Sequence, residues 1–420
     1  MGVDRREALL AGLAAWGVGP VSAQAAADPL AGEALYADVK TYSDLGEHRT
    51  GTPGDTATTA WMLKSLRAAG YDAQPQAFDY PVFEVEATAL KLGDELFDAF
   101  PYWTPKPTPP GGVSGQLSLT GGPGKIALVF LGPGAGGGLN QPPPAAISEA
   151  VAAGSAAVVV VTESPLGELS ALNRTPKAAP WPVPVILVAG SNSQHLRIAV
   201  DGVDARVHLD GRTVPGKAEN VIGRRPGRGK HLVISTPKSG WFHCAGERGS
   251  GVAIWLGLAR WLAATSDWNL TVVATSGHEF DGYGGHIFTD TLAPKPAETR
   301  LWLHIGANVA AYDFLVRGEG RSIVRLAGPQ PGRLLACSDA LMPLAAKAFA
   351  GQPGYAEPVD IDRQKPPGEL THFQNLGYAP LIGVVSLHPL HHTRRDLPDV
   401  TGPAMLEPVA RGLQAVLAKA

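Results

Sequence analysis

The loop at residues 235–251 concentrates side chains that could do chemistry. Its sequence, STPKSGWFHCAGERGSG, follows the apolar run HLVI and precedes the helical pattern VAIWLGLARWLAA. Its ionisable and thiol side chains are Lys238, His243, Cys244, Glu247 and Arg248. A polar loop between a strand and a helix is a common position for a ligand site in an α/β protein. The loop therefore predicts a functional site and leaves open whether it is a working metal site, an altered one or a polar loop without chemistry.

Polar side chains recur at the ends of the later apolar runs. The run NLTVVATSG is followed by His278 and Glu279, the run RLWLHIGAN contains His304, and a late loop adds His391 and His392. In doubly wound sheets, ligands bind outside the carboxyl ends of the strands, where such side chains meet. Imidazole and carboxylate groups from separate strand ends are what a metal-assisted hydrolase needs. We therefore expect these residues to share one site.

The elements that must position these residues alternate regularly after residue 220. Buried parallel strands are continuous apolar runs, and HLVIST, NLTVVATSG, RLWLHIGAN and APLIGVVS have this form. Helical patterns lie between and after them, at GVAIWLGLARWLAATS, ACSDALMPLAAKAFA and PAMLEPVARGLQAVLAKA. An earlier helical pattern, TATTAWMLKSLRAAGYDA, contains a natural helix stop at Gly70. The order of elements predicts an α/β fold.

Two stretches rich in proline and glycine divide the chain. WTPKPTPPGG and GRTVPGKAENV are plausible linkers, and a short α/β or β-rich pattern lies between them. A chain of 420 residues is too long for one small core. We expect one domain formed by residues 26–85 and 217–420, interrupted by an insertion over residues 86–216.

The amino terminus has the layout of an export signal. DRREALLAGLAAWGVGPVSAQA has a charged start, an apolar stretch and a small-residue end. Arg5 and Arg6 favour a twin-arginine signal over residues 1–25, and an ordinary signal is the alternative. We therefore expect a periplasmic or secreted protein, and no later segment is long and apolar enough to suggest a membrane span.

The net charge and the cysteine count make some classes of function less consistent with the sequence. The formal net charge of −3 argues against a nucleic-acid partner, which normally requires a basic surface. Cys244 and Cys337 are too few for a disulfide framework, although one bond between them stays possible. His243 and Cys244 leave a nucleophile pair as a minor alternative, and a metal-free hydrolase using His278 and Cys244 is another.

Residues 40–420 resemble the zinc aminopeptidases of the leucyl-aminopeptidase type, which are related to the glutaminyl cyclases. The resemblance rests on HRTGTPGDTATTAWMLKSLRAAGYDAQPQAFDY, on AENVIG and on HHTRRDLPD, which is similar to the family's His-Thr-x-x-Asp end motif. Residues 86–216 resemble a protease-associated domain. The resemblance implies a mixed, mostly parallel sheet with helices on both faces, a smaller β/α insertion, and hydrolysis of an amide bond in a peptide or small amide.

This chain departs from the family at the first metal position. The resemblance places Thr236 and Lys238 where the family has His-x-Asp, Glu247 at the bridging aspartate, and His304 at a later aspartate ligand. An ammonium about 4 Å from a dication opposes it by several kcal/mol at an effective dielectric of ~20. We therefore expect the first metal to be absent, with Lys238 neutralising Glu247 in its place.

The residues at the second metal position match the family's ligands more closely than those at the first. The resemblance assigns Glu247, Glu279 and His392 as ligands of one zinc with an open position for water. His278 replaces the family's glutamate base, and an imidazole can serve as a general base near neutral pH. The alternative role for His278 is a hydrogen bond to Glu247 or Glu279. His304 and Lys238 would shape the catalytic end of the site.

The remaining candidates are substrate-binding residues. They are Arg248, His391 and His372, the last in THFQNLGYAP, which resembles the family's Ser-Asp-His-x-x-Phe segment. The sequence thus predicts an exported metallohydrolase with at most one zinc, acting on an amide bond. The alternative is a metal-free pseudoenzyme that binds a peptide or another partner in the same pocket, which a salt bridge between Lys238 and Glu247 would favour. Composition and motifs leave the substrate and the oligomeric state open.

Overall fold

The computed structural model describes most of the chain after the predicted export signal. The described residues are 28–132, 144–162, 164, 166–174, 179–200, 202–317, 322–366 and 368–419. The predicted signal at residues 1–25 lies outside them. No helix among the described residues is long and apolar enough to cross a membrane.

Parallel strands form the part of the sheet that carries the candidate site. Their order is β9-β8-β10-β15, and each neighbouring pair is parallel. Their bounds are β8 (Arg228–Pro237), β9 (Trp268–Thr275), β10 (Thr299–Ile305) and β15 (Leu381–Val385). At the edge beyond β15 lie β13 (Leu334–Cys337), which is antiparallel to β15, and β14 (Val359–Asp360). The predicted mixed, mostly parallel α/β sheet is confirmed.

Helices cover both faces of this sheet, as predicted. Successive residues of a strand point to opposite faces, so Leu232 and Ile234 of β8 enter one core while Val233 enters another. The first core is shared with α1 (Gly32–Asp44), α2 (Pro53–Ala68), α5 (Ser250–Thr265), α7 (Met342–Ala348) and α9 (Pro403–Leu417). The second is shared with α6 (Tyr283–Thr291) and α8 (Leu370–Asn375). The first ten residues of α5 are all buried, as expected for a helix that is apolar all round.

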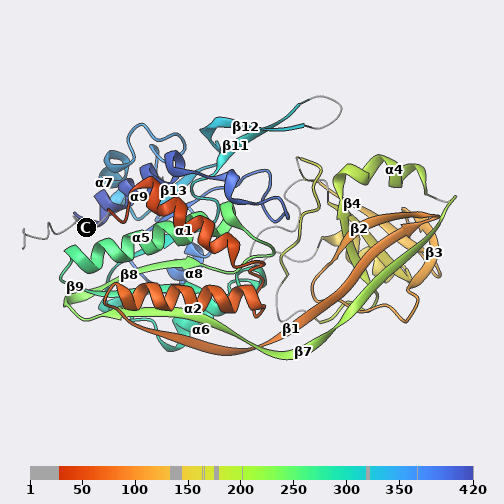
Figure 1. Cartoon of the computed structure of the whole chain (residues 1–420), viewed down its shortest axis with the longest axis horizontal. Helices are drawn as coiled ribbons and strands as arrows, with labels where there is room; N and C mark the ends of the chain where they lie inside the picture. Colours follow the sequence, from red (N-terminus) through yellow and green to blue (C-terminus); the bar gives the residue numbers. More distant parts are fainter. Residues whose placement is uncertain are drawn as a thin grey trace, which may run out of the picture.

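A long two-stranded ribbon joins this part of the molecule to the remaining strands. β1 (Asp72–Leu92) and β7 (Asp204–Arg225) pair antiparallel from Asp72 opposite Arg224 to Leu92 opposite Ala205. Figure 1 shows the two strands running side by side from the helix-rich part of the molecule toward the strand-rich part. Residues 86 and 216, the predicted limits of the insertion, both lie within this ribbon. The division into domains stays a prediction.

The strand-rich part has its own apolar core. It contains β2 (Glu95–Pro101), β3 (Val113–Ser118), β4 (Ile126–Leu131), β5 (Ala157–Thr162), β6 (Val185–Ala189), α3 (Ala145–Ala152) and α4 (Ser193–Ile198). Its core also includes Trp241, which lies within the 235–251 loop, and Phe280, which directly follows Glu279. Their packing fixes the site loops against the strand-rich part. A separate hairpin, β11 (Tyr312–Arg317) and β12 (Ser322–Pro329), projects from the molecule (Figure 1).

Candidate active site

The turn that carries Glu247 is fixed by the last residue of the His-Thr-x-x-Asp motif. A π-helical turn at Ala245–Gly249 leads directly into α5. The backbone N–H groups of Gly246 and Glu247 donate to the two carboxylate oxygens of Asp396, at 2.6 and 2.9 Å. Asp396 thereby satisfies amide donors that a helix start leaves unpaired. Its role is to hold the turn that presents Glu247.

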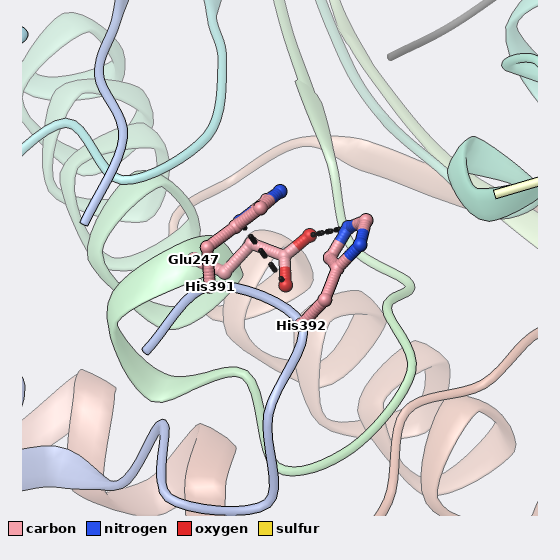
Figure 2. A group of neighbouring side chains, drawn as sticks. All are labelled: Glu247, His391 and His392. Atoms are coloured by element: carbon pink, nitrogen blue, oxygen red, sulfur yellow. Dashed lines mark ion pairs between the residues drawn. The ribbon is translucent and has the colours of Figure 1, made fainter. Parts of the chain in front are cut away.

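Glu247 lies between two histidines of the late loop. His392 Nε2 is 3.3 Å from Glu247 Oε1, and His391 Nδ1 is 3.7 Å from Oε2. The two imidazole rings are stacked at 3.8 Å, and Figure 2 shows both directed at the carboxylate. One potential ligand atom from each of the three residues lies within 4.8 Å of the others. This group contains two of the three predicted zinc ligands, with His391 in place of Glu279.

His392 is held by a segment of the strand-rich part. Its Nδ1 is 2.9 Å from the carbonyl oxygen of Ala171, and the Ala171 N–H donates to the His392 carbonyl at 2.9 Å. Because a carbonyl oxygen only accepts, Nδ1 carries the proton and Nε2 faces Glu247. A second partner of this type commonly orients a metal-binding histidine. The same contact orients His392 toward Glu247 without any metal.

The cation that neutralises Glu247 is Arg248. Arg248 Nη2 is 2.7 Å from Glu247 Oε1, and both side chains are fully buried. Burial alone would raise the pKa of Glu247, but Arg248 and the two histidines hold that pKa well below its usual range. The guanidinium is fixed from behind, since Arg248 Nε donates to the Ser239 carbonyl at 2.8 Å. Arg248, predicted to bind substrate, forms a buried ion pair with Glu247, and its substrate-binding role stays a prediction.

Lys238 does not neutralise Glu247, contrary to the expectation from sequence. Its ammonium forms a buried ion pair with Asp55, in the first turn of α2, and donates to Ser276 Oγ at 2.7 Å. Ser276 Oγ in turn donates to the Asp55 carboxylate at 2.7 Å. Asp55, 183 residues before Lys238 in the sequence, is the carboxylate that the fold brings to this ammonium. Lys238 therefore belongs to a buried structural cluster.

Glu279 is bonded away from the cluster around Glu247. Its Oε1 accepts from the Thr50 backbone N–H at 2.7 Å and from the Thr50 hydroxyl at 2.9 Å. Its Oε2 accepts from Ser239 Oγ at 2.7 Å. Among the described residues, Glu279 is not in the group whose ligand atoms converge on Glu247. The structure thus does not bring the three predicted zinc ligands together.

A second polar cluster forms around Glu369, which sequence reasoning missed. Glu369 Oε2 lies 3.3 Å from His278 Nδ1 and 3.5 Å from His304 Nε2. All three side chains are mostly buried, and His278 is the most exposed at 13%. A signal was available: aligning Phe373 with the phenylalanine of Ser-Asp-His-x-x-Phe places Glu369 at the aspartate. The structure thus joins His278 and His304, as predicted, through an unforeseen carboxylate.

The protonation of this cluster follows from its neighbours. Burial alone would raise the pKa of Glu369, but His278, His304 and Arg248 lower it to about 2, so Glu369 is ionised. Burial lowers the pKa of His304 to about 4, so that ring is neutral at pH 7. Trp302 Nε1 donates to Ser235 Oγ at 2.8 Å, and Ser235 Oγ is 2.9 Å from His304 Nδ1. The Ser235 hydroxyl can therefore donate to Nδ1 and leave the His304 proton on Nε2, facing Glu369.

Two buried histidines should make the protein sensitive to mild acid. Burial lowers the pKa of His48 to about 3 and that of His304 to about 4. Both stay neutral in the folded state, whereas the unfolded chain takes up protons below pH ~6.5. Stability is therefore unaffected above that pH and falls as the pH drops below it. We expect each histidine to lower the free energy of unfolding by about 2 kcal/mol between pH 7 and pH 5.

Urea unfolding at the two pH values measures this effect. His48 is stacked on Tyr42 at 3.7 Å and its Nδ1 is 3.0 Å from Thr58 Oγ1, so glutamine keeps a polar side chain there. His48→Gln should reduce the pH dependence by about 2 kcal/mol, because glutamine does not titrate. An unchanged pH dependence in this variant would show that His48 is not held neutral by the fold.

His372 lies beside the second cluster but faces α6. Its Nε2 is 2.9 Å from Thr289 Oγ1, and its ring contacts that of His286 at 4.0 Å. His372 is one helical turn after Glu369, so the two side chains belong to the same end of α8. Its predicted substrate-binding role stays a prediction.

The cysteines do not support a thiol nucleophile. Both Cys244 and Cys337 are buried and unpaired, so the possible disulfide is absent. Burial raises the pKa of the Cys244 thiol well above its usual value, and its Sγ accepts from the Phe242 N–H at 3.3 Å. Since the thiolate is the nucleophile, Cys244 is a packed structural residue.

The residues present do not fit a zinc ion while Arg248 is in place. The Glu247 oxygen nearest His392 is the one already paired with the guanidinium. His391 Nδ1 is engaged as well, because Asn308 Nδ2 donates to it at 3.2 Å. At an effective dielectric of ~20, a dication about 4 Å from a unit positive charge is repelled by roughly 8 kcal/mol. The guanidinium therefore supplies the positive charge beside Glu247 that a metal ion would otherwise supply.

The fold is that of the zinc aminopeptidases. A zinc aminopeptidase from Bacillus subtilis matches with a TM-score of 0.71 and 16% identity, over 93% of this chain and 95% of that one. An aminopeptidase from Aneurinibacillus sp. strain AM-1 matches with a TM-score of 0.64 and 18% identity, over 92% and 93% of the two chains. At these identities the likeness defines the shared fold.

Sequence comparison adds one partial relative. The probable lipoprotein aminopeptidase LpqL of Mycobacterium tuberculosis is 31% identical over 90 residues. This match spans 20% of the present chain and only 18% of that protein. No protein-family model matches the chain. The resemblance seen in the sequence is thus supported by structure over nearly the whole chain and by sequence over a fifth of it.

Proposed function

We propose that this protein works without zinc and uses the pocket of the aminopeptidase fold to bind a peptide or small amide. The observation that carries this proposal is the fully buried ion pair between Arg248 and Glu247. It neutralises Glu247, which the sequence resemblance places at the position of the aspartate that bridges the metals in zinc aminopeptidases. The aminopeptidases that share the fold act on peptides, which is the reason for this choice of ligand class.

The pair also explains how the pocket remains stable without an ion. A buried carboxylate left unpaired costs several kcal/mol, and a guanidinium removes that cost if it stays in place. The bond from Arg248 Nε to the Ser239 carbonyl keeps it in place. Glu247 and His392, assigned to the second metal position by the resemblance, thus lie together with a protein cation paired to the carboxylate. Export to the periplasm or beyond, predicted from residues 1–25, is part of the proposal.

A one-zinc hydrolase is the second candidate. The convergence of Glu247, His391 and His392 within 4.8 Å favours it, since two imidazoles and one carboxylate are a known catalytic zinc set. This candidate requires Arg248 to leave Glu247 and His391 to release Asn308. Both movements would break buried interactions.

Titration of the chelator-treated protein with zinc decides between the two candidates. We expect no saturable heat of binding at micromolar zinc, and an unchanged saturation-transfer NMR signal from a small amide such as leucinamide whether or not zinc is added. A transition at one zinc per chain, together with ligand binding that needs zinc, would support the one-zinc hydrolase instead. A control with Glu279→Gln should behave like the parent, because Glu279 faces Thr50 and Ser239.

A further inference from the structure

We propose that the pocket also hydrolyses carboxylic esters without a metal, with His278 as general base and Glu369 as the residue that orients it. This inference rests on the proposed metal-free pocket but adds an activity to it. It starts from the cluster of His278, Glu369 and His304, in which two imidazole nitrogens meet one carboxylate oxygen.

The cluster determines which nitrogen of His278 is free. Glu369 Oε2 lies 3.3 Å from His278 Nδ1, and the two atoms are buried without another hydrogen-bond partner among the described residues. An ionised carboxylate only accepts hydrogen bonds, so its charge favours the tautomer with the proton on Nδ1. Nε2 of the neutral ring then holds the lone pair. An imidazole whose far nitrogen is held by a carboxylate is the base of serine and related hydrolases.

The two histidines of the cluster differ in their surroundings, because His304 has protein partners at both ring nitrogens. Ser235 Oγ is 2.9 Å from His304 Nδ1, and Trp302 Nε1 donates to the same Ser235 oxygen. Both nitrogens of His304 therefore face protein groups, and the ring is neutral. His278 is the more exposed of the two histidines, at 13% against 8%. It is therefore the most solvent-accessible member of the cluster and the one that we assign to contact water.

Arg248 supplies positive charge for the oxyanion. Its Nη1 is buried and has no hydrogen-bond partner among the described residues. Its charge reaches the cluster, since Arg248 contributes to lowering the pKa of both Glu369 and His304. A buried donor without a partner, whose charge acts on the same cluster, is a suitable stabiliser for charge that develops during the reaction. The ion pair that excludes zinc would thus also serve the chemistry.

The reaction is ordinary base-catalysed hydrolysis. His278 Nε2 removes a proton from water as the water oxygen bonds to the ester carbonyl carbon, and the carbonyl oxygen becomes an oxyanion facing Arg248. The oxyanion then re-forms the carbonyl, the bond to the alcohol oxygen breaks, and the His278 imidazolium returns its proton to that oxygen. The products are a carboxylic acid and an alcohol. An ester suits this site better than an amide, because no metal polarises the carbonyl and the alkoxide leaves more readily.

The test uses 4-nitrophenyl acetate and full-length protein treated with a chelator. We expect hydrolysis above the buffer rate that added zinc does not increase. His278→Ala should lower kcat/KM by about 100-fold or more, and free imidazole should restore part of the rate. The matched control is His195→Ala, since His195 forms a solvent-exposed pair with Glu95 at 3.1 Å and should be dispensable. Circular dichroism checks that each variant is folded.

Glu369 is tested as a positioning residue through a split between kcat and KM. Glu369→Gln can donate to His278 Nδ1 and so favours the wrong tautomer, which should lower kcat while KM stays within about two-fold. Activity at the buffer rate in the parent, or equal loss in His278→Ala and His195→Ala, would overturn the inference and leave the metal-free binding function standing. Activity that appears only with zinc would overturn both.

Discussion

Replacement of Arg248 by methionine is expected to destabilise the protein by about 3–5 kcal/mol and to make its stability depend on zinc. The guanidinium pairs with Glu247 at 2.7 Å, and both groups are fully buried. Removal of one partner leaves a buried carboxylate without its counter-charge, which costs an energy of this size. The same change removes the repulsion that opposes a dication beside Glu247, His391 and His392. Urea unfolding of parent and variant, each with and without micromolar zinc, measures both effects.

Arg333→Met is the matched control for this experiment. Arg333 is also mostly buried, at 7% exposure, and lies over the Tyr355 ring at 4.9 Å, away from the two polar clusters. Its loss should also reduce stability, but zinc should not restore it. If zinc stabilises the parent protein as strongly as it stabilises Arg248→Met, then Arg248 does not exclude the metal and the account of the pocket is wrong.

Replacement of Lys238 by methionine should have a comparable cost for a different reason. Lys238 and Asp55 form an ion pair whose side chains are 0% and 2% exposed, with Ser276 hydrogen-bonded to both. We expect Lys238→Met to lower the free energy of unfolding by about 3–5 kcal/mol. Zinc should not rescue this variant, because Lys238 lies in a different cluster from Glu247.

A double-mutant cycle distinguishes the interaction energy of the Lys238–Asp55 pair from the loss of packing in each single variant. Asp55→Asn keeps the size of the side chain but removes the negative charge, and its one amide oxygen, placed at the Oδ2 position, can still accept from Ser276 Oγ and the Gly51 N–H. The variant with both changes should be more stable than the sum of the single losses predicts, by about 1–3 kcal/mol. Strict additivity would mean that Lys238 and Asp55 do not interact, and that Lys238 is free for the catalytic role suggested by sequence.

The fold could be predicted because its signals are local. The continuous apolar runs at the four parallel strands, the helical spacing between them and the His-Thr-x-x-Asp motif all survive in the sequence. The same signals located Glu247 and His392 at one site, and the structure places them 3.3 Å apart. His278 and His304 were also expected to lie together, and Glu369 joins them.

The charge pairing in the site could not be predicted in the same way. Which carboxylate neutralises Lys238 depends on the position of α2 relative to the sheet, and that packing brings Asp55 to the ammonium. Arg248 follows Glu247 directly, and adjacent residues seldom face one another in a regular helix. The π-helical turn at residues 245–249 allows them to pair. Sequence spacing alone gives no indication of this turn.

Residue type alone favours His372 over Glu369 as the site residue of this segment. The two are three residues apart at the start of α8, but Glu369 faces His278 and His304 while His372 faces Thr289. The role of a buried carboxylate with two imidazole partners can be inferred only from the contacts that form in the folded protein. Burial and pairing, rather than residue type, therefore separate the two residues.

The metal content of the purified protein shows directly whether the Arg248 guanidinium excludes zinc. Protein prepared without chelators and with zinc in the growth medium would be analysed by inductively coupled plasma mass spectrometry beside Arg248→Met. We expect far less than one zinc per chain in the parent and a rise toward one in the variant. One zinc per chain in the parent, retained after dialysis, would contradict this expectation and would show that the pocket holds a metal despite the buried guanidinium.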